Sequence, residues 1–334
     1  MGLDMLNYRY ILKKAAQLII TLLILTVLIF IISMLATGDP LRSYFGEAVE
    51  RMSPEQLGIA RESLGLNDNI AVQYMRWLAN ALKGDFGISY KYRQDVLAVI
   101  GSVFINTALL TFSSLVLIFL LSCTLAVLCV MKEGSIIDTL ISKAGVATGS
   151  IPVFFVALIL IMIFSVNLGM LPSSGAYSYS GSGTISDRIP YLVLPVSSII
   201  ITHLWYCTHM IKSKLSDEIR KEYVLLCKVK GLSETRIILL HCMKNIMPAI
   251  VSMMAVFLPH LIGGTYVVEM VFSYPGLGRL GFESALYHDY NMLMVISLIT
   301  GFFVTVCSMV SQVINEKLDP RMHHEENCGG GWFE

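Results

Sequence analysis

The chain has 334 residues, of which 55% are hydrophobic and 14% are charged, with no formal net charge and a mean hydropathy of +0.69. Soluble domains carry about 25% charged residues, so a chain this apolar must place most of its length in lipid. The balanced charge gives no reason to expect nucleic acid as a partner. The seven cysteines contain no CxxC pair, which argues against a zinc or disulfide framework.

Six apolar segments are long enough to cross a bilayer, which takes about 20 residues in a helix. They cover residues 11–35, 107–131, 144–166, 192–211, 249–271 and 291–314. The first is longer than the apolar core of a secretory signal peptide and lacks a good cleavage site, so we expect it to stay as an anchor. The sequence therefore predicts an all-α membrane protein with six transmembrane helices.

Basic residues near the spans predict the orientation of the chain. Arg9, Lys13 and Lys14 precede the first span, and a larger basic group follows the fourth. The short segments on the opposite side carry little beyond Arg188 and Arg279. Because cytoplasmic segments of membrane proteins are enriched in Lys and Arg, we expect both termini and the segment after the fourth span to lie in the cytoplasm.

The residues between the first two spans, 38–102, predict a small helical cap on the outer side. Ser53 followed by Pro54 is a favourable helix start. A second helix is expected over residues 71–82, where apolar side chains recur on one face. The Gly-Asp-Phe-Gly run at 84–87 then predicts a turn.

A basic segment with helical periodicity, residues 215–248, lies between the fourth and fifth spans. Its apolar residues recur in steps of four, four, three and three, so we expect one stripe along a single helix. The residues of this stripe are Leu215, Ile219, Tyr223, Leu226 and Val229. Gly231 is expected to end the helix, and Ser233 to cap a second one. This pattern predicts a docking element for a partner protein; the alternative is an amphipathic helix lying on the membrane surface.

Ionisable residues inside the spans are candidates for a translocation path. Glu269 lies near the outer end of the fifth span, where burying a carboxylate is less costly than at the centre. His203 and His209 are separated by about 600° of helical rotation, so they face different sides and cannot bind one ion together. His260 in the fifth span is expected to lie apart from both. We name Glu269, His260 and His203 as path candidates, with packing or hydrogen bonding as the alternative role, and expect no metal site.

Four sequence blocks stand in order along nearly the whole chain. They are GDPL at 38–41, LGLNDNIAVQYMRWLANALKGDFGISY at 64–90, SIPVFF at 150–155 with LGMLPSSG at 168–175, and EYVLLCKVKGLSETRIILLHCMKNIMP at 222–248 followed by VVEMVFSYPGLGRL at 267–280 and LDPR at 318–321. In this order and spacing they resemble the permease subunits of the oligopeptide, dipeptide and nickel class of ABC importers. The resemblance implies a type I ABC importer permease fold.

The resemblance also implies a domain organisation. Its parts are the cytoplasmic N-terminus and first helix at 1–37, the outer cap at 38–102, a five-helix core at 103–316 with a coupling loop at about 213–247, and a cytoplasmic tail at 317–334. In such permeases the coupling loop inserts into a groove of an ATP-binding subunit.

The residues expected at this contact are Glu222, Tyr223, Leu226, Cys227, Lys230 and Gly231. Asn245 and Pro248 match the closing Asn and Pro of the family block. The usual Arg-Thr-Ala-Arg-Ala run is replaced at 225–229, which leaves Leu225 without the charge for an ion pair there.

Energy for transport must come from a partner or from an ion gradient, because the chain has no G-x-x-x-x-G-K-[ST] phosphate loop. The resemblance implies that ATP and Mg²⁺ are bound by two separate cytoplasmic ATP-binding subunits. This chain is then a transport subunit without a cofactor, and not an enzyme. Its expected partners are a second homologous permease in a heterodimer, an extracytoplasmic substrate-binding protein and the lipid of a bacterial cytoplasmic membrane.

Two other classes of protein fit the sequence less well. A secondary transporter is expected to show internal repeats and paired charges at the midplane of the membrane, and an intramembrane metalloprotease would show an HExxH pattern. Neither signal is present in the sequence. For the cargo we favour di- or oligopeptides, with nickel or another metal carried as a small-molecule chelate as the alternative.

Overall fold

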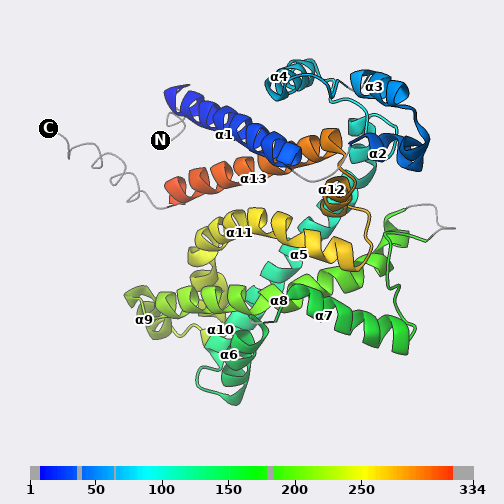
Figure 1. Cartoon of the computed structure of the whole chain (residues 1–334). Helices are drawn as coiled ribbons and strands as arrows, with labels where there is room; N and C mark the ends of the chain where they lie inside the picture. The colour runs from blue at the N-terminus through cyan, green and yellow to red at the C-terminus, as the bar shows by residue number, and fades with distance from the viewer. Residues whose placement is uncertain (1–7, 36–39, 64, 150, 179–183, 319–334) are drawn as a thin grey trace. The chain divides into compact units, whose positions relative to one another are not determined.

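The structure is a computed structural model that describes residues 8–35, 40–63, 65–149, 151–178 and 184–318. In these residues every regular element is helical, as Figure 1 shows. The helices are α1 (Tyr8–Leu35), α2 (Pro40–Phe45), η1 (Gly46–Arg51), α3 (Pro54–Ser63), α4 (Ile70–Ala81), α5 (Val96–Met131), α6 (Ile136–Gly149), α7 (Val153–Leu160), η2 (Ile161–Asn167), α8 (Ile185–Ile219), α9 (Glu222–Val229), α10 (Glu234–Ile237), η3 (Ile238–Cys242), α11 (Met243–Val271), α12 (Leu277–Leu286) and α13 (Tyr290–Leu318). Each of the four family blocks includes at least one residue outside the described ranges, and nearly all of the expected tail at 317–334 also lies outside them.

The helices form two compact units. One comprises residues 1–107 and 275–306, and the other comprises residues 108–274 and 307–334. The helices α5 and α13 each contribute to both units. The domain boundaries expected from the sequence separate the parts of the chain by the side of the membrane on which they lie. The two units are defined by packing instead, so they do not test those boundaries, which stay a prediction.

A buried apolar cluster holds the first unit together. Its members come from α5, α12 and α13: Val96, Val99, Ile100, Leu277, Leu280, Met292, Val295 and Ile296. Trp77 of α4 and Phe86 pack against this cluster. The helix α4 also meets α1, because the Tyr74 hydroxyl lies 3.0 Å from Oγ1 of Thr26 and the Tyr74 ring lies 5.4 Å from that of Phe30. Within the segment between the first two spans, α4 and Phe86 therefore pack onto the long helices of this unit.

The two helices expected between the first two spans are confirmed. A capping box precedes α3: Oγ of Ser53 accepts a hydrogen bond from the N–H of Gln56 at 3.3 Å, and the N–H of Ser53 donates to Oε1 of Gln56 at 2.9 Å. Pro54 then occupies the first helical position. The helix α4 begins and ends one residue before the expected range 71–82. Both glycines of the following turn have positive φ, a conformation that glycine adopts without steric cost.

The second unit has a larger apolar cluster in which α8 takes part over much of its length. The helix α8 packs against α6, α7 and α11, and its Ile211 and Leu215 are fully buried. The described cysteines are free, and Cys129, Cys207 and Cys242 are buried. They act as small apolar core residues, as the sequence predicts.

Five helical segments in the described part of the chain are long and apolar enough to cross a membrane: residues 12–35, 96–131, 186–219, 234–271 and 290–314. The remaining predicted span, 144–166, is not a single helix of that length. The helix α6 ends at Gly149, and after Pro152 the chain continues as α7 and the π-helix η2. Proline disfavours helical backbone at the residue before it, so this apolar run is divided into two shorter helices.

Candidate functional site

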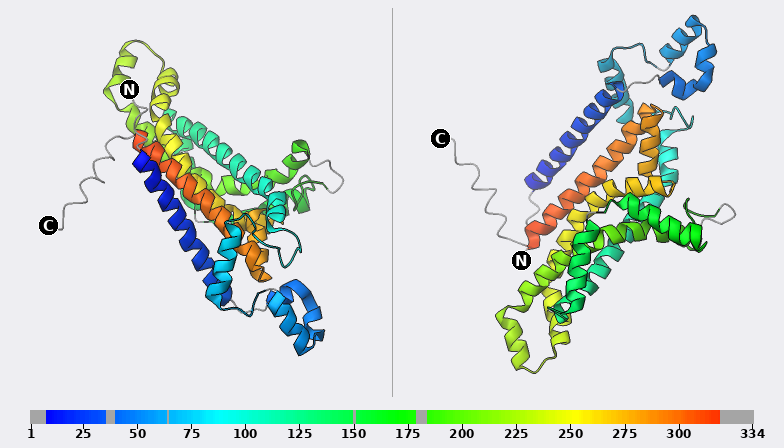
Figure 2. Two further views of the ribbon diagram at one scale, coloured as in Figure 1. Left: turned by 90° about the horizontal axis from the view of Figure 1, so that it is seen from above. Right: turned by 60° about the horizontal axis from the view of Figure 1, so that its bottom comes forward.

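The predicted docking segment is a helical hairpin that follows α8. The helix α8 ends at Ile219, Lys221 is extended with ψ of 150°, and α9 begins at Glu222. Both views in Figure 2 show the hairpin of α9 and α10, in yellow-green, projecting beyond the adjoining ends of α8 and α11. The expectation of one helix with a single stripe from Leu215 to Val229 is therefore wrong. Leu215 is fully buried on α8, whereas Val229 on α9 is 79% exposed.

Glu218 joins the hairpin to the long helices. Its side chain is 8% exposed, and its Oε1 accepts hydrogen bonds from the Tyr223 hydroxyl at 2.9 Å and from Nδ2 of Asn245 at 3.0 Å. Nζ of Lys221 lies 2.5 Å from Oε2. Tyr223 belongs to α9 and Asn245 to α11, so one carboxylate connects three helices. Buried charges are stable only when they are paired and hydrogen-bonded, and these contacts supply both conditions.

Gly231 ends α9 in a Schellman motif. Its φ is +78°, its N–H donates to the carbonyl of Lys228 at 3.0 Å, and the N–H of Leu232 donates to the carbonyl of Cys227 at 3.2 Å. Leu232 and Cys227 both pack against the core of the second unit. The predicted glycine break is confirmed. Ser233 stands at the predicted N-cap of α10, but its side chain makes no capping hydrogen bond.

The helix α9 has a buried face and an exposed face. Val224 is buried, and Tyr223 and Cys227 pack against the core. The exposed residues are Glu222, Leu225, Leu226, Lys228, Val229 and Lys230. Leu226 is 63% exposed. Of the residues expected to contact a partner, Tyr223 and Cys227 thus face inward, while the others lie at the surface.

The structure brings together two of the path candidates. His203 of α8 and His260 of α11 have ring centroids 5.7 Å apart, and the Phe257 ring lies 5.3 Å from that of His203. Both imidazoles line a cavity of about 660 Å³. The expectation that His260 lies apart from His203 is wrong, because spacing within one helix carries no information about which residues of two helices meet. His209 is exposed and does not line the cavity, as the helical rotation predicts.

Glu269 does not belong to this cavity. It is fully buried near the end of α11, and its carbonyl accepts a hydrogen bond from the N–H of Tyr274 at 2.8 Å. About 13 Å of helical rise separates it from His260, and it is not among the residues that line the cavity. The three path candidates therefore do not form one site.

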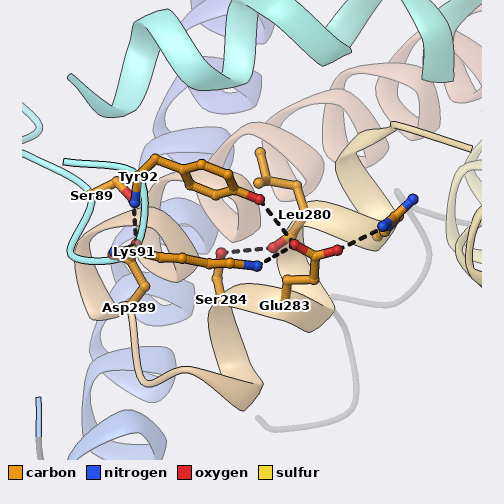
Figure 3. A network of polar contacts seen from close by, with 8 residues as sticks. Ser89, Lys91, Tyr92, Leu280, Glu283, Ser284 and Asp289 are labelled. Carbon is orange, nitrogen blue, oxygen red and sulfur yellow. Dashed lines mark hydrogen bonds and ion pairs between the residues drawn. The ribbon is translucent and has the colours of Figure 1, made fainter. Parts of the chain in front are cut away.

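A polar network in the first unit surrounds Glu283 of α12 (Figure 3). Its Oε2 accepts hydrogen bonds from Nζ of Lys91 at 2.5 Å and from the Tyr92 hydroxyl at 2.9 Å. Its Oε1 accepts one from Nε of Arg279 at 2.9 Å. Burial alone would raise the pKa of Glu283, but these hydrogen bonds outweigh it and hold that pKa below its usual value.

Asp289 provides a second anchor for the same loop. Its Oδ2 accepts hydrogen bonds from the Ser89 hydroxyl at 2.5 Å and from the N–H of Lys91 at 3.2 Å. In Figure 3, Ser89, Lys91 and Tyr92 come from one loop and meet the acidic residues of the α12 region. Lys91 and Glu283 are 192 residues apart in the sequence, so no local pattern reveals their pairing.

Comparison with known protein families identifies the fold and the broad role of the chain. Residues 118–324 match the family model described as binding-protein-dependent transport system inner membrane component, and residues 5–111 match the model of its N-terminal region. The chain belongs to this family. It is therefore a multi-pass inner-membrane permease component of a binding-protein-dependent transport system, as the four sequence blocks predicted.

Three relatives cover the permease almost end to end. The oligopeptide transport system permease protein AppB of Bacillus subtilis is 32% identical, over 94% of this chain and 99% of the relative. The glutathione transport system permease protein GsiC of Salmonella paratyphi A is 31% identical, over 96% and 100%. The metal-staphylopine import system permease protein CntB of Staphylococcus aureus is 28% identical, over 94% and 98%.

A solved structure shares the fold of the permease. It is a chain of the MetNI methionine ABC transporter in an inward-facing conformation, with a TM-score of 0.53 and 18% sequence identity. The match covers 67% of this permease and 97% of that chain. At this identity the likeness shows the fold alone.

The sequence interpretation missed Glu218, although a signal for it was present. Ile211, Leu215 and Glu218 are spaced four and three residues apart, so Glu218 continues the buried face of α8. An acidic residue on a buried helical face needs partners from elsewhere in the fold. Its partner Asn245 lay within a recognised family block, but the block gives no indication of what that amide contacts.

Proposed function

We propose that this permease is one of two homologous transmembrane subunits of an ATP-driven importer of di- and oligopeptides. Its similarity to an oligopeptide permease and a glutathione permease supports a peptide cargo. Its similarity to a metal-staphylopine permease keeps a metal chelate as the alternative. In this proposal ATP and Mg²⁺ are bound by two cytoplasmic partner subunits, both termini are cytoplasmic, and a binding protein delivers the cargo to the outer side.

The exposed face of α9 is the proposed contact with an ATP-binding subunit. The observation that carries this assignment is the combination of a solvent-exposed apolar face with a rigid attachment behind it. Leu225 and Leu226 are 66% and 63% exposed, while Glu218 and the Gly231 cap fix the two ends of α9. Exposed apolar surface marks a contact with a protein or a membrane, and in this proposal the contact is with the ATP-binding subunit. Rigid attachment lets a movement of the partner act on α8 and α11 instead of being absorbed by a loop.

Replacing Leu226 by Asp tests the contact. A buried interface leucine contributes about 1.5–3 kcal/mol, so we expect the variant to lose at least about tenfold in affinity for the ATP-binding subunits. Insertion into the membrane should be unchanged, because the Leu226 side chain lies largely at the surface. Co-purification of the ATP-binding subunits in gentle detergent measures the effect.

Leu82→Asp is the matched control. Leu82 is 82% exposed and follows α4 in the other unit, so the same substitution there should leave the ATP-binding subunits attached. Retention of these subunits by Leu226→Asp at the wild-type level would refute the assignment of α9.

A further inference from the structure

The cavity lined by His203 and His260 has the size and wall of a small-molecule site. Its volume of about 660 Å³ falls within the usual range of about 300–1,000 Å³ for such sites. Much of its wall is apolar, with aromatic and thioether side chains such as Phe119, Met210 and Met253. Methionine side chains adapt to ligands of different shape, so this part of the wall does not select one side chain.

The polar groups on the wall share one property. They include two imidazoles, the phenol of Tyr206 and the hydroxyls of Thr202 and Ser252. A neutral imidazole, a phenol and an aliphatic hydroxyl can each both donate and accept hydrogen bonds. The described residues that line the cavity include no Asp, Glu, Lys or Arg. A wall of this kind matches a ligand that presents donors together with acceptors, and it offers no countercharge to an ion.

A bare metal ion is a poor match for the cavity. Metal sites in proteins use three or four His, Cys or carboxylate ligands, and the described residues contain no group of three or more that could hold a metal ion. A peptide backbone fits better, because each amide offers one N–H donor and one C=O acceptor. Leaving these groups unpaired in an apolar environment is strongly unfavourable. Two imidazoles with centroids 5.7 Å apart lie within reach of neighbouring amides, which repeat at about 3.4 Å along an extended chain.

We propose that this cavity is a binding station for a short peptide in transit. His203 and His260 hydrogen-bond the backbone amides, and the methionine and phenylalanine wall receives the side chains. The station therefore recognises what all peptides share and leaves selection among them to other parts of the system. The inference rests on the proposed peptide importer and goes beyond it by naming the contacts that the cargo makes inside the membrane.

Peptide uptake by the complete importer, reconstituted in lipid vesicles with ATP and its binding protein, tests the station with trialanine as the probe. His260→Leu and His203→Leu should each lower uptake about tenfold, the order expected for one lost buried hydrogen bond. His260→Gln and His203→Gln should stay within about threefold of the wild type, because glutamine also carries a donor and an acceptor. His209→Leu is the matched control on α8, and it should transport normally because His209 does not line the cavity. Co-purification of the ATP-binding subunits should be the same for all variants.

Three outcomes overturn the inference in different ways. If the leucine variants take up trialanine as fast as the wild type, the cavity is not a binding station, but the proposed peptide import is unaffected. A loss in the glutamine variants as large as in the leucine variants contradicts the hydrogen-bonding role of the two imidazoles. Failure of the wild type to take up trialanine, with ATP hydrolysis intact, refutes the proposed peptide function itself and the station with it.

Discussion

Glu218→Gln is the substitution that most directly tests how the hairpin is held. The substitution keeps the shape of the side chain and one acceptor oxygen, so Tyr223 and Asn245 still have a partner, but the charge is lost. We expect the start of α9 to loosen relative to α11. The result should be a lower free energy of unfolding and weaker binding of the ATP-binding subunits.

The magnitude follows from the three contacts of the carboxylate. Hydrogen bonds to a charged group contribute about 1.5–3 kcal/mol each, against about 0.5–1.5 kcal/mol for neutral pairs, so the two bonds from Tyr223 and Asn245 together lose about 2 kcal/mol. The Lys221 side chain is 58% exposed, and an ion pair with so exposed a partner contributes at most about 0.5 kcal/mol. We therefore expect Glu218→Gln to cost about 2 kcal/mol and Lys221→Ala to cost less than about 0.5 kcal/mol.

A double-mutant cycle separates this network from a general loss of stability. Unfolding of the purified permease in mixed micelles is measured for Glu218→Gln, Tyr223→Phe and the double variant. Groups in direct contact show coupling energies of about 0.5–3 kcal/mol, and we expect about 1 kcal/mol here. If the effects of the two substitutions add, so that no coupling energy is resolved, Glu218 does not hold α9 through Tyr223.

Three further predictions concern other parts of the chain. Gly231→Ala should destabilise the hairpin by about 1 kcal/mol, because its φ of +78° is costly for a residue with a side chain. Gly264→Ala, at a helical position with open space around the new Cβ, should not; limited proteolysis of the hairpin compares the two. Gly301→Ala should weaken the packing of α1 on α13 by about 1–3 kcal/mol, since the new Cβ would lie 2.3 Å from Cδ2 of Leu25, and adding Leu25→Val should restore thermal stability if this clash is the cause. The pKa of Glu283 is lowered on folding, so its contribution to stability is complete above its unfolded pKa, about 4.3, and is lost as pH falls through the folded value. Glu283→Gln should therefore make the thermal midpoint less sensitive to acid below about pH 5; an unchanged acid dependence would contradict this account.

Local sequence signals predicted the features that depend on neighbouring residues. The Ser-Pro start of α3, the extent of α4 and the break at Gly231 each follow from residues within a few positions of one another. The apolar face expected on α4 is wrong: Val72, Met75 and Leu82 of that face are exposed, and Tyr74 and Trp77 pack inward instead. Capping, periodicity and positive φ are properties of short segments, so a single sequence is enough to reveal them. The same reasoning identified five of the long apolar helices, since length and hydropathy along one segment define a span.

Features that depend on two distant segments were not accessible in this way. The apolar stripe from Leu215 to Val229 is continuous in the sequence, but the helix is interrupted between Ile219 and Glu222. The contacts of Glu218 with Tyr223 and Asn245 stabilise this interruption, which periodicity does not detect. The approach of His203 to His260 depends on how α8 lies against α11. The pairing of Lys91 with Glu283 likewise depends on how the loop before α5 meets α12. In each case only the tertiary structure identifies the residue that makes the contact.

The Glu218 network and the proposed peptide station lie on the same two helices, α8 and α11. Movement of α9 by its partner should therefore be transmitted along these helices to the station. Glu218 and His203 on α8, and Asn245 and His260 on α11, are each separated by about 22 Å of helical rise. Between Asn245 and His260, α11 contains Pro248 and Pro259, whereas the stretch of α8 between His203 and Glu218 contains no proline; the prolines of α8, Pro190 and Pro195, come before His203. Proline removes a backbone hydrogen bond and favours bending. We therefore expect movement of α9 to bend α11 and leave α8 straight. Distances between spin labels placed across the two prolines of α11 should change when the importer binds ATP, while a label pair of equal spacing on α8 should not. Equal changes on both helices would refute the idea that α11 alone bends.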